Sequence, residues 1–176
     1  YRYTDTPSTV TTATWTTPVT TFVIGASMRA EIAVSGDTLY AAPANGSYQV
    51  PTMYRSTDGG ANWVATTTQP GAGAWGAGQA WYNLNVVINP ANPLEVVVGA
   101  VDAYRSLDGG IIWTRISAWT TSVAPTLPYV HADHHEGVWF EGGNKLLLGT
   151  DGGIFYSTDK GTTFSDRNVG LRLKQF

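Results

Sequence analysis

The sequence Ser-Thr-Asp-Gly-Gly-Ala-Asn-Trp at positions 56–63 decides the fold, because two similar segments follow it along the chain. They are Ser-Leu-Asp-Gly-Gly-Ile-Ile-Trp at 106–113 and Ser-Thr-Asp-Lys-Gly-Thr-Thr-Phe at 157–164. The aspartates of the three copies recur at intervals of 50 and 51 residues. Self-similarity at such a fixed period is the signature of a repeat protein.

The chemistry of the motif predicts a hairpin between two strands. Its aspartate can accept hydrogen bonds from N–H groups of the turn, and its glycines allow the positive φ that a tight turn needs. The aromatic residue at its end then packs back into the core. We therefore expect structural rather than catalytic roles for Ser56, Asp58, Gly60, Trp63, Ser106, Asp108, Gly110, Trp113, Ser157, Asp159, Gly161 and Phe164.

Short apolar runs bounded by Gly, Pro, Asn and Asp predict four strands in each repeat, without helical periodicity. The expected strands are 31–34, 38–42, 52–56 and 62–66 in the first repeat, 85–88, 95–99, 103–106 and 111–116 in the second, and 137–141, 145–149, 153–157 and 162–166 in the third. Four-stranded antiparallel sheets joined by tight turns are the blades of a β-propeller. The sequence thus predicts an all-β propeller.

The repeats also divide the chain. We expect the outer half of a blade at 1–24, full blades at 25–68, 69–117 and 118–167, and a lead into the next blade at 168–176. Propellers typically have about 4–8 blades, so about three and a half blades cannot close a ring. We expect part of a larger propeller, excised or processed because the chain begins with Tyr1. Closure by self-association is the alternative.

The pattern Ser/Thr-x-Asp-x-Gly-x-x-Trp/Phe resembles the Asp-box, or BNR repeat, of propellers in sialidases, xyloglucan hydrolases and sortilin-type receptors. The segment 131–176 is similar to blades of xyloglucanase-like proteins and of large secreted surface proteins of Bacteroidetes-type bacteria. The resemblance implies a secreted or cell-surface protein. It does not favour a sialidase, because an Arg-Ile-Pro-type segment is absent. We expect Arg55 and Arg105, which lie on strands beside the motifs, to make local contacts.

Composition excludes several classes of function. Charged residues make up 13% of the chain and the net charge is −3, so no basic stripe for nucleic acid is present. No apolar run reaches the roughly 20 residues of a membrane span. The absence of cysteine removes disulfides and zinc ribbons.

Because the chain reverses at each turn of a blade, the Asp-boxes fall on one face of the propeller. We call the opposite face the box-free face, and its expected segments are 25–30, 42–51, 69–82, 100–102, 117–135 and 150–152. Two of its links, 67–83 and 117–136, are long and aromatic, which is typical of functional loops. The candidate ligand-binding residues are Trp75, Trp81, Tyr82, Trp119 and Tyr129. Packing on the edge of a blade is the alternative role for their rings.

The densest polar cluster, His-Ala-Asp-His-His-Glu at 131–136, contains all three histidines of the chain. Imidazole and carboxylate suit a divalent metal, and the candidate ligands are His131, Asp133, His134 and His135. The alternative is that these side chains hydrogen-bond to one another inside the blade. No organic cofactor is implied.

Asp133 and Asp151 are the candidate catalytic carboxylates, since glycosidases use such a pair. The sequence therefore leaves three functions open. The first is a module that binds a glycan or an extracellular protein through the box-free face. The second is a glycoside hydrolase with channel-facing carboxylates, and the third is an architectural segment of a large assembly joined to further blades of the same or another chain.

Overall fold

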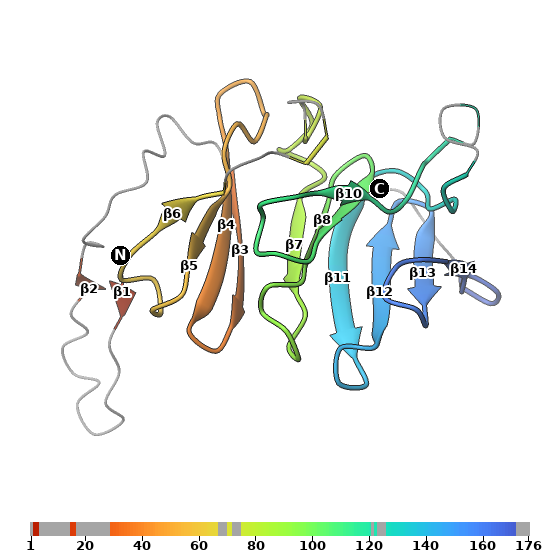
Figure 1. The fold of residues 1–176 in the computed structure, drawn as a ribbon. Coiled ribbons are helices and arrows are strands. Elements are labelled where there is room, and N and C mark those ends of the chain that lie inside the picture. Colours follow the sequence, from red (N-terminus) through yellow and green to blue (C-terminus); the bar gives the residue numbers. More distant parts are fainter. Residues whose placement is uncertain are drawn as a thin grey trace.

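In the residues that the structure describes, the chain forms three four-stranded antiparallel sheets. The structure, a computed structural model, describes residues 2–3, 15–16, 29–66, 70–71, 75–120, 122 and 126–171. Within this part of the chain the regular elements are all strands. In each sheet the strands follow one another in chain order, as expected for propeller blades (Figure 1). The predicted all-β class is confirmed.

The strand bounds follow the three repeats. The first blade contains β3 (Arg29–Ser35), β4 (Thr38–Ala44), β5 (Tyr54–Ser56) and β6 (Val64–Ala65). The second contains β7 (Asn85–Ile88), β8 (Val96–Gly99), β9 (Ala103–Ser106) and β10 (Thr114–Arg115). The third contains β11 (His134–Phe140), β12 (Lys145–Thr150), β13 (Gly153–Ser157) and β14 (Ser165–Asp166). A short antiparallel pair, β1 (Arg2–Tyr3) and β2 (Trp15–Thr16), precedes them.

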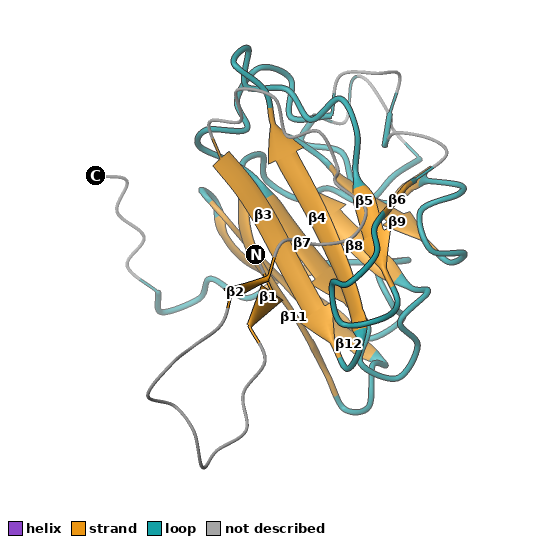
Figure 2. Ribbon diagram, turned by 90° about the vertical axis from the view of Figure 1, so that its left-hand side faces the viewer, coloured by secondary structure: helices purple, strands orange, loops and turns teal. Residues whose placement is uncertain are grey.

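The blades lie side by side, with their first strands next to one another. Strand β7 contacts both β3 and β11. Figure 2 looks onto the first blade, where β3, β4, β5 and β6 follow one another across the sheet. The first strand of each blade is therefore the inner strand, and the Asp-box hairpin joins the two outer strands.

The hairpins are closed by the hydrogen bonds that the motif predicts. In the first, Ser56 Oγ donates to Asp58 Oδ1 at 2.8 Å and accepts from Gly60 N at 2.9 Å. Asp58 Oδ1 also accepts from Asn62 N at 2.8 Å. The same serine-to-aspartate bond is 2.7 Å long in the second hairpin and 2.8 Å in the third. Gly60 has a φ of 85°, which explains the glycine at this place.

The outermost strands are shorter than the apolar pattern predicts. In the first blade the fourth strand covers Val64–Ala65 instead of 62–66, and in the second it covers Thr114–Arg115 instead of 111–116. The reason is local, because the N–H groups of Asn62 and Ile112 donate to the hairpin aspartates. These two N–H groups therefore cannot take part in hydrogen bonds between strands.

Two arginines bridge neighbouring blades, which differs from the local contacts expected for them. Arg55 in β5 donates to the carbonyl oxygen of Gly109 at 3.5 Å. Arg105 in β9 donates to the carbonyl oxygen of Lys160. Each arginine lies three residues before its own hairpin aspartate and reaches the carbonyl just after the aspartate of the next blade. The repeat thus carries a link to its successor.

Apolar side chains fill the space between blades. Between the first and second blades the buried cluster includes Tyr40, Met53, Val86, Ile88 and Val98. Between the second and third blades it consists of Val97, Ala103, Ile116, Trp139, Leu146 and Leu148. Among the residues described here, no helix is long and apolar enough to cross a membrane.

Candidate functional site

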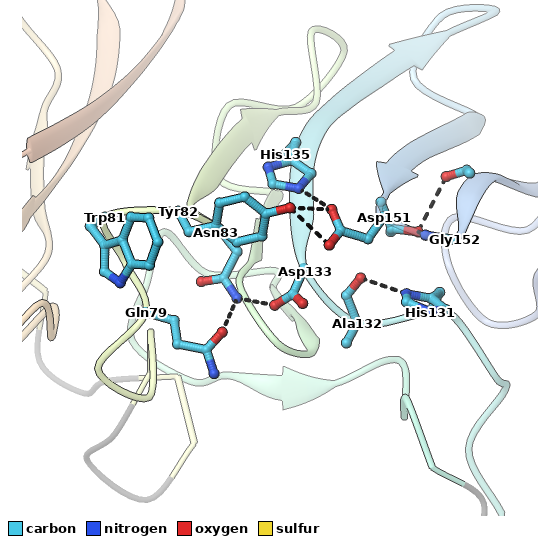
Figure 3. A network of polar contacts seen from close by, with 12 residues as sticks. Gln79, Trp81, Tyr82, Asn83, His131, Ala132, Asp133, His135, Asp151 and Gly152 are labelled. Atoms are coloured by element: carbon cyan, nitrogen blue, oxygen red, sulfur yellow. Dashed lines mark hydrogen bonds and ion pairs between the residues drawn. The ribbon is translucent and has the colours of Figure 1, made fainter. Parts of the chain in front are cut away.

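A polar network joins the second and third blades on the box-free face (Figure 3). Tyr82 precedes β7, His135 lies in β11, and Asp151 lies in the turn between β12 and β13. The hydroxyl of Tyr82 lies 2.9 Å from both carboxylate oxygens of Asp151. Nε2 of His135 lies 2.7 Å from Asp151 Oδ1. Because a carboxylate only accepts hydrogen bonds, both partners act as donors and fix its orientation.

The second candidate acid, Asp133, lies beside this network. Asn83 donates from Nδ2 to Asp133 Oδ1, and the backbone N of Asp151 donates to the carbonyl oxygen of Asp133 at 3.2 Å. Asp133 has a φ of 64°, an uncommon conformation for a residue other than glycine. The fold therefore brings the two predicted catalytic acids to neighbouring turns.

A row of aromatic rings leads up to the carboxylates. The ring centroids of Tyr48 and Trp81 are 6.4 Å apart, and those of Trp81 and Tyr82 are 5.5 Å apart. Tyr82 then meets the ring of His135 edge-on at 4.8 Å. The side chain of Trp81 remains 59% exposed. The row thus spans all three blades and keeps one large ring accessible.

The segment that carries these rings is held from the first blade. Arg29, the first residue of β3, donates to the carbonyl oxygens of Trp81, Tyr82 and Leu84 at 3.3, 3.1 and 3.0 Å. On the same side, the backbone N of Ala80 donates to the carbonyl oxygen of Tyr48 at 3.0 Å.

The other predicted aromatic residues have different surroundings. Trp75 is only 3% exposed and belongs to the core between the first and second blades. Its ring therefore packs instead of offering a ligand surface, and the carbonyl oxygen of Trp75 accepts a hydrogen bond of 3.4 Å from Val50 N of the first blade. Trp119 and Tyr129 are about half exposed, as the ligand-binding prediction requires. The backbone of Trp119 is held by a hydrogen bond of 3.1 Å from its N to Asp102 Oδ1.

The four residues predicted as metal ligands face different surroundings. His134 is fully buried, and this burial, together with smaller effects of His135 and His131, lowers its pKa from 6.5 to about 3. His131 packs on Gly152, while Asp133 and His135 are held by the network described above. In the described ranges no three His, Asp or Glu side chains could hold one ion. The structure therefore does not form the predicted metal site.

Sequence reasoning missed four residues that build this face, namely Arg29, Tyr48, Gln79 and Asn83. Three of them lie in segments predicted to belong to the box-free face, which was the available signal. Asn83 follows directly on the last of these segments and also donates to Gln79 Oε1 at 3.5 Å. The prediction could thus have been extended to the polar residues that flank the aromatic ones.

The sheets, their order and the arrangement of the inner strands define the class as a β-propeller with four-stranded antiparallel blades. Among solved structures, the chain is similar to a GH74 enzyme of Niastella koreensis, with 20% identity and a TM-score of 0.52. The similarity covers 77% of this chain but 17% of that enzyme. An ancestral GH74 enzyme gives 18% identity and a TM-score of 0.57, covering 81% of this chain and 20% of the enzyme.

At these identities the likeness establishes the fold alone. The chain spans about a fifth or less of the two enzymes. No family model and no curated protein matches the sequence.

Proposed function

We propose that the chain is a segment of an extracellular carbohydrate-active propeller that binds a glycan through its box-free face. The observation that carries the proposal is the row of Tyr48, Trp81 and Tyr82 beside the carboxylate of Asp151. Aromatic rings combine an apolar face with edges that tolerate water, and binding sites place a few polar groups beside such apolar surface.

The geometry suits a sugar chain. The face of a sugar ring presents C–H groups that can pack on the indole of Trp81, while its hydroxyls can reach the carboxylate and imidazole of Asp151 and His135. Holding these groups in advance lowers the entropy lost on binding. The GH74 enzymes are glycoside hydrolases, and their likeness to this chain supports a carbohydrate ligand and an extracellular location.

The proposal is tested with a panel of soluble polysaccharides and the Trp81→Ala variant. Retention of the bound polysaccharide should fall by about tenfold, the equivalent of one large stacking contact. The melting temperature should stay nearly unchanged because the ring is largely exposed. Ile112→Ala is the matched control, since Ile112 is an exposed apolar residue of an Asp-box hairpin on the opposite face. Equal retention by Trp81→Ala and wild type would contradict the proposal.

A glycoside hydrolase is the second candidate, favoured by the neighbouring positions of Asp133 and Asp151. In such enzymes one carboxyl group protonates the leaving oxygen and the other activates water or attacks the sugar. Asp133→Asn and Asp151→Asn should each abolish release of reducing ends by the full-length protein while polysaccharide retention persists. Unchanged release in both variants would exclude this pair.

A further inference from the structure

Four backbone carbonyl oxygens of one loop converge on a single side chain from another blade. The loop covers residues 75–84 and leads into β7. Nη1 of Arg29 lies 3.5, 3.3 and 3.1 Å from the carbonyl oxygens of Ala80, Trp81 and Tyr82. Nη2 lies 3.0 Å from the carbonyl oxygen of Leu84. The guanidinium therefore spans the part of the loop that bears Trp81 and Tyr82.

Such a cluster of carbonyls needs a cation at its centre. Carbonyl oxygens that point to one place carry like partial charges and repel one another, and a planar guanidinium supplies up to five donors to neutralise them. Glu31 Oε2 lies 3.4 Å from Nη2 of the same arginine, so the cation is itself balanced. Burial raises the pKa of Glu31, and the neighbouring Arg29 opposes the rise.

Turn hydrogen bonds form within the loop, from Gln79 N to the carbonyl oxygen of Gly76 at 2.6 Å and from Tyr82 N to that of Gln79 at 2.8 Å, but part of its backbone is strained. Gly76, Ala77 and Gly78 have φ values of 90°, 45° and 75°, a run of left-handed conformations that costs energy at the alanine. Contacts outside the loop must therefore hold this backbone. They include the bond from Ala80 N to the carbonyl oxygen of Tyr48, the bond from Val50 N to that of Trp75, and the contacts of the arginine.

We propose that Arg29 is a positioning residue for the glycan site. It fixes the backbone of Trp81 and Tyr82 from the first blade, and through the Tyr82 hydroxyl it sets the orientation of Asp151 in the third. Arg29 does this without contacting the sugar. The role in binding rests on the proposed function, whereas the hold on the loop can be measured independently of any ligand.

The experiment compares Arg29→Gln and Arg29→Lys with Arg55→Gln. Arg55 is the matched control because it also donates to a carbonyl of the next blade, but beside an Asp-box. Two properties are measured in each protein, the indole N–H resonance of Trp81, assigned with Trp81→Phe, and the affinity for the polysaccharide that wild type binds best.

We expect Arg29→Gln to shift or broaden the Trp81 resonance and to weaken binding by about tenfold, the loss of a charge-assisted hydrogen-bond cluster. Arg29→Lys keeps the charge but loses the fork, so it should restore part of both properties. Arg55→Gln should change neither. The lysine variant keeps the test decisive if the glutamine variant fails to fold.

The two levels of the proposal fail in different ways. An unperturbed Trp81 resonance in both Arg29 variants would overturn the positioning role, whatever the polysaccharide result. A perturbed resonance with unchanged affinity would overturn the link to binding. If wild type binds no polysaccharide, the proposed function fails, while the resonance still decides whether Arg29 holds the loop.

Discussion

The two joints between blades are built differently although the repeats are similar. Between the first and second blades the apolar cluster is larger, and an arginine borders it on each face: Arg29 reaches the carbonyl oxygen of Tyr82 on the box-free face, and Arg55 reaches that of Gly109 on the Asp-box face. Between the second and third blades a smaller apolar cluster is bordered by polar networks at both faces. The first joint thus has the larger apolar core, and the second holds the carboxylates of the candidate site.

The network on the Asp-box side of the second joint shows how a buried charge is kept there. Glu95 is almost fully buried, and its Oε2 accepts from Asn89 Nδ2 at 2.8 Å and lies 3.6 Å from Lys160 Nζ. Nδ2 of the same asparagine donates to the carbonyl oxygen of Gly143 at 2.9 Å. Buried charges require such partners. Both rims of this joint therefore depend on specific hydrogen bonds.

The largest expected effect is a loss of stability from the apolar cluster between the first and second blades. Met53→Ala should lower the free energy of unfolding by about 2–5 kcal/mol, because it leaves a cavity at a fully buried position. Denaturant unfolding measures the loss. Val64→Ala, at an exposed position of β6, is the control and should change stability by less than about 0.5 kcal/mol. Similar small losses in both variants would contradict the role of Met53 in the apolar core of the first joint.

The second joint is tested by two adjacent glycines with the same backbone preference. Gly142 and Gly143 have φ values of 66° and 79°, so alanine strains both. A Cβ on Gly143 would collide with the Asn89 side chain, while one on Gly142 meets nothing within 4 Å. Gly143→Ala should therefore cost about 1–3 kcal/mol more than Gly142→Ala in thermal unfolding. Equal costs would mean that this rim contributes no specific packing.

The box-free rim should respond more weakly. Tyr82→Phe removes the hydroxyl bonded to Asp151 but keeps the ring, so stability should fall by about 0.5–1.5 kcal/mol. Because His135 still holds the carboxylate, the sheets should remain assembled. Chemical unfolding gives the energy, and polysaccharide retention should drop in the same variant. A loss as large as that of Met53→Ala would place this rim in the structural core.

The smallest expected effect is a loss of stability at low pH, which involves the hairpin aspartates of all three blades. Hydrogen bonds from the backbone and side chain of Asn62, and then from Ser56, lower the pKa of Asp58 from 3.8 to about 2. A lowered pKa in the folded state stabilises the fold above about pH 4, and this contribution is lost as the pH falls through 2. Melting curves between these pH values should show the decline, and Asp58→Asn should flatten it. If the melting temperature of this variant falls with pH as steeply as that of wild type, other carboxyl groups cause the loss.

The sequence was sufficient for features that depend on local order. The period of Asp58, Asp108 and Asp159 predicted the blades, and the chemistry of the motif predicted the hydrogen bonds from N–H groups of each turn to its aspartate. Chain reversal at each turn also predicted that Asp133 and Asp151 share a face, because the side of a sheet on which a turn falls follows from counting strands.

Contacts between blades were not predictable in the same way. The reach of Arg105 to Lys160 and the burial of Trp75 depend on how neighbouring sheets pack, which no local pattern specifies. The predicted metal site does not form for a related reason. His134 and His135 point to opposite sides of β11, so His134 lies in the core while His135 lies at the surface beside Asp151. Proximity in sequence therefore overstated their proximity in space.

The arginine links between blades bear on how such a chain grows. The second unit carries both halves of such a link, the forward-reaching guanidinium of Arg105 and the carbonyl of Gly109 that receives Arg55, so a duplicated copy of this segment would encode a blade that already fits its neighbours. In the third blade the corresponding position is Tyr156, whose ring packs against Phe140 and beneath Arg167. The third blade therefore lacks the arginine through which the first two blades reach their successors.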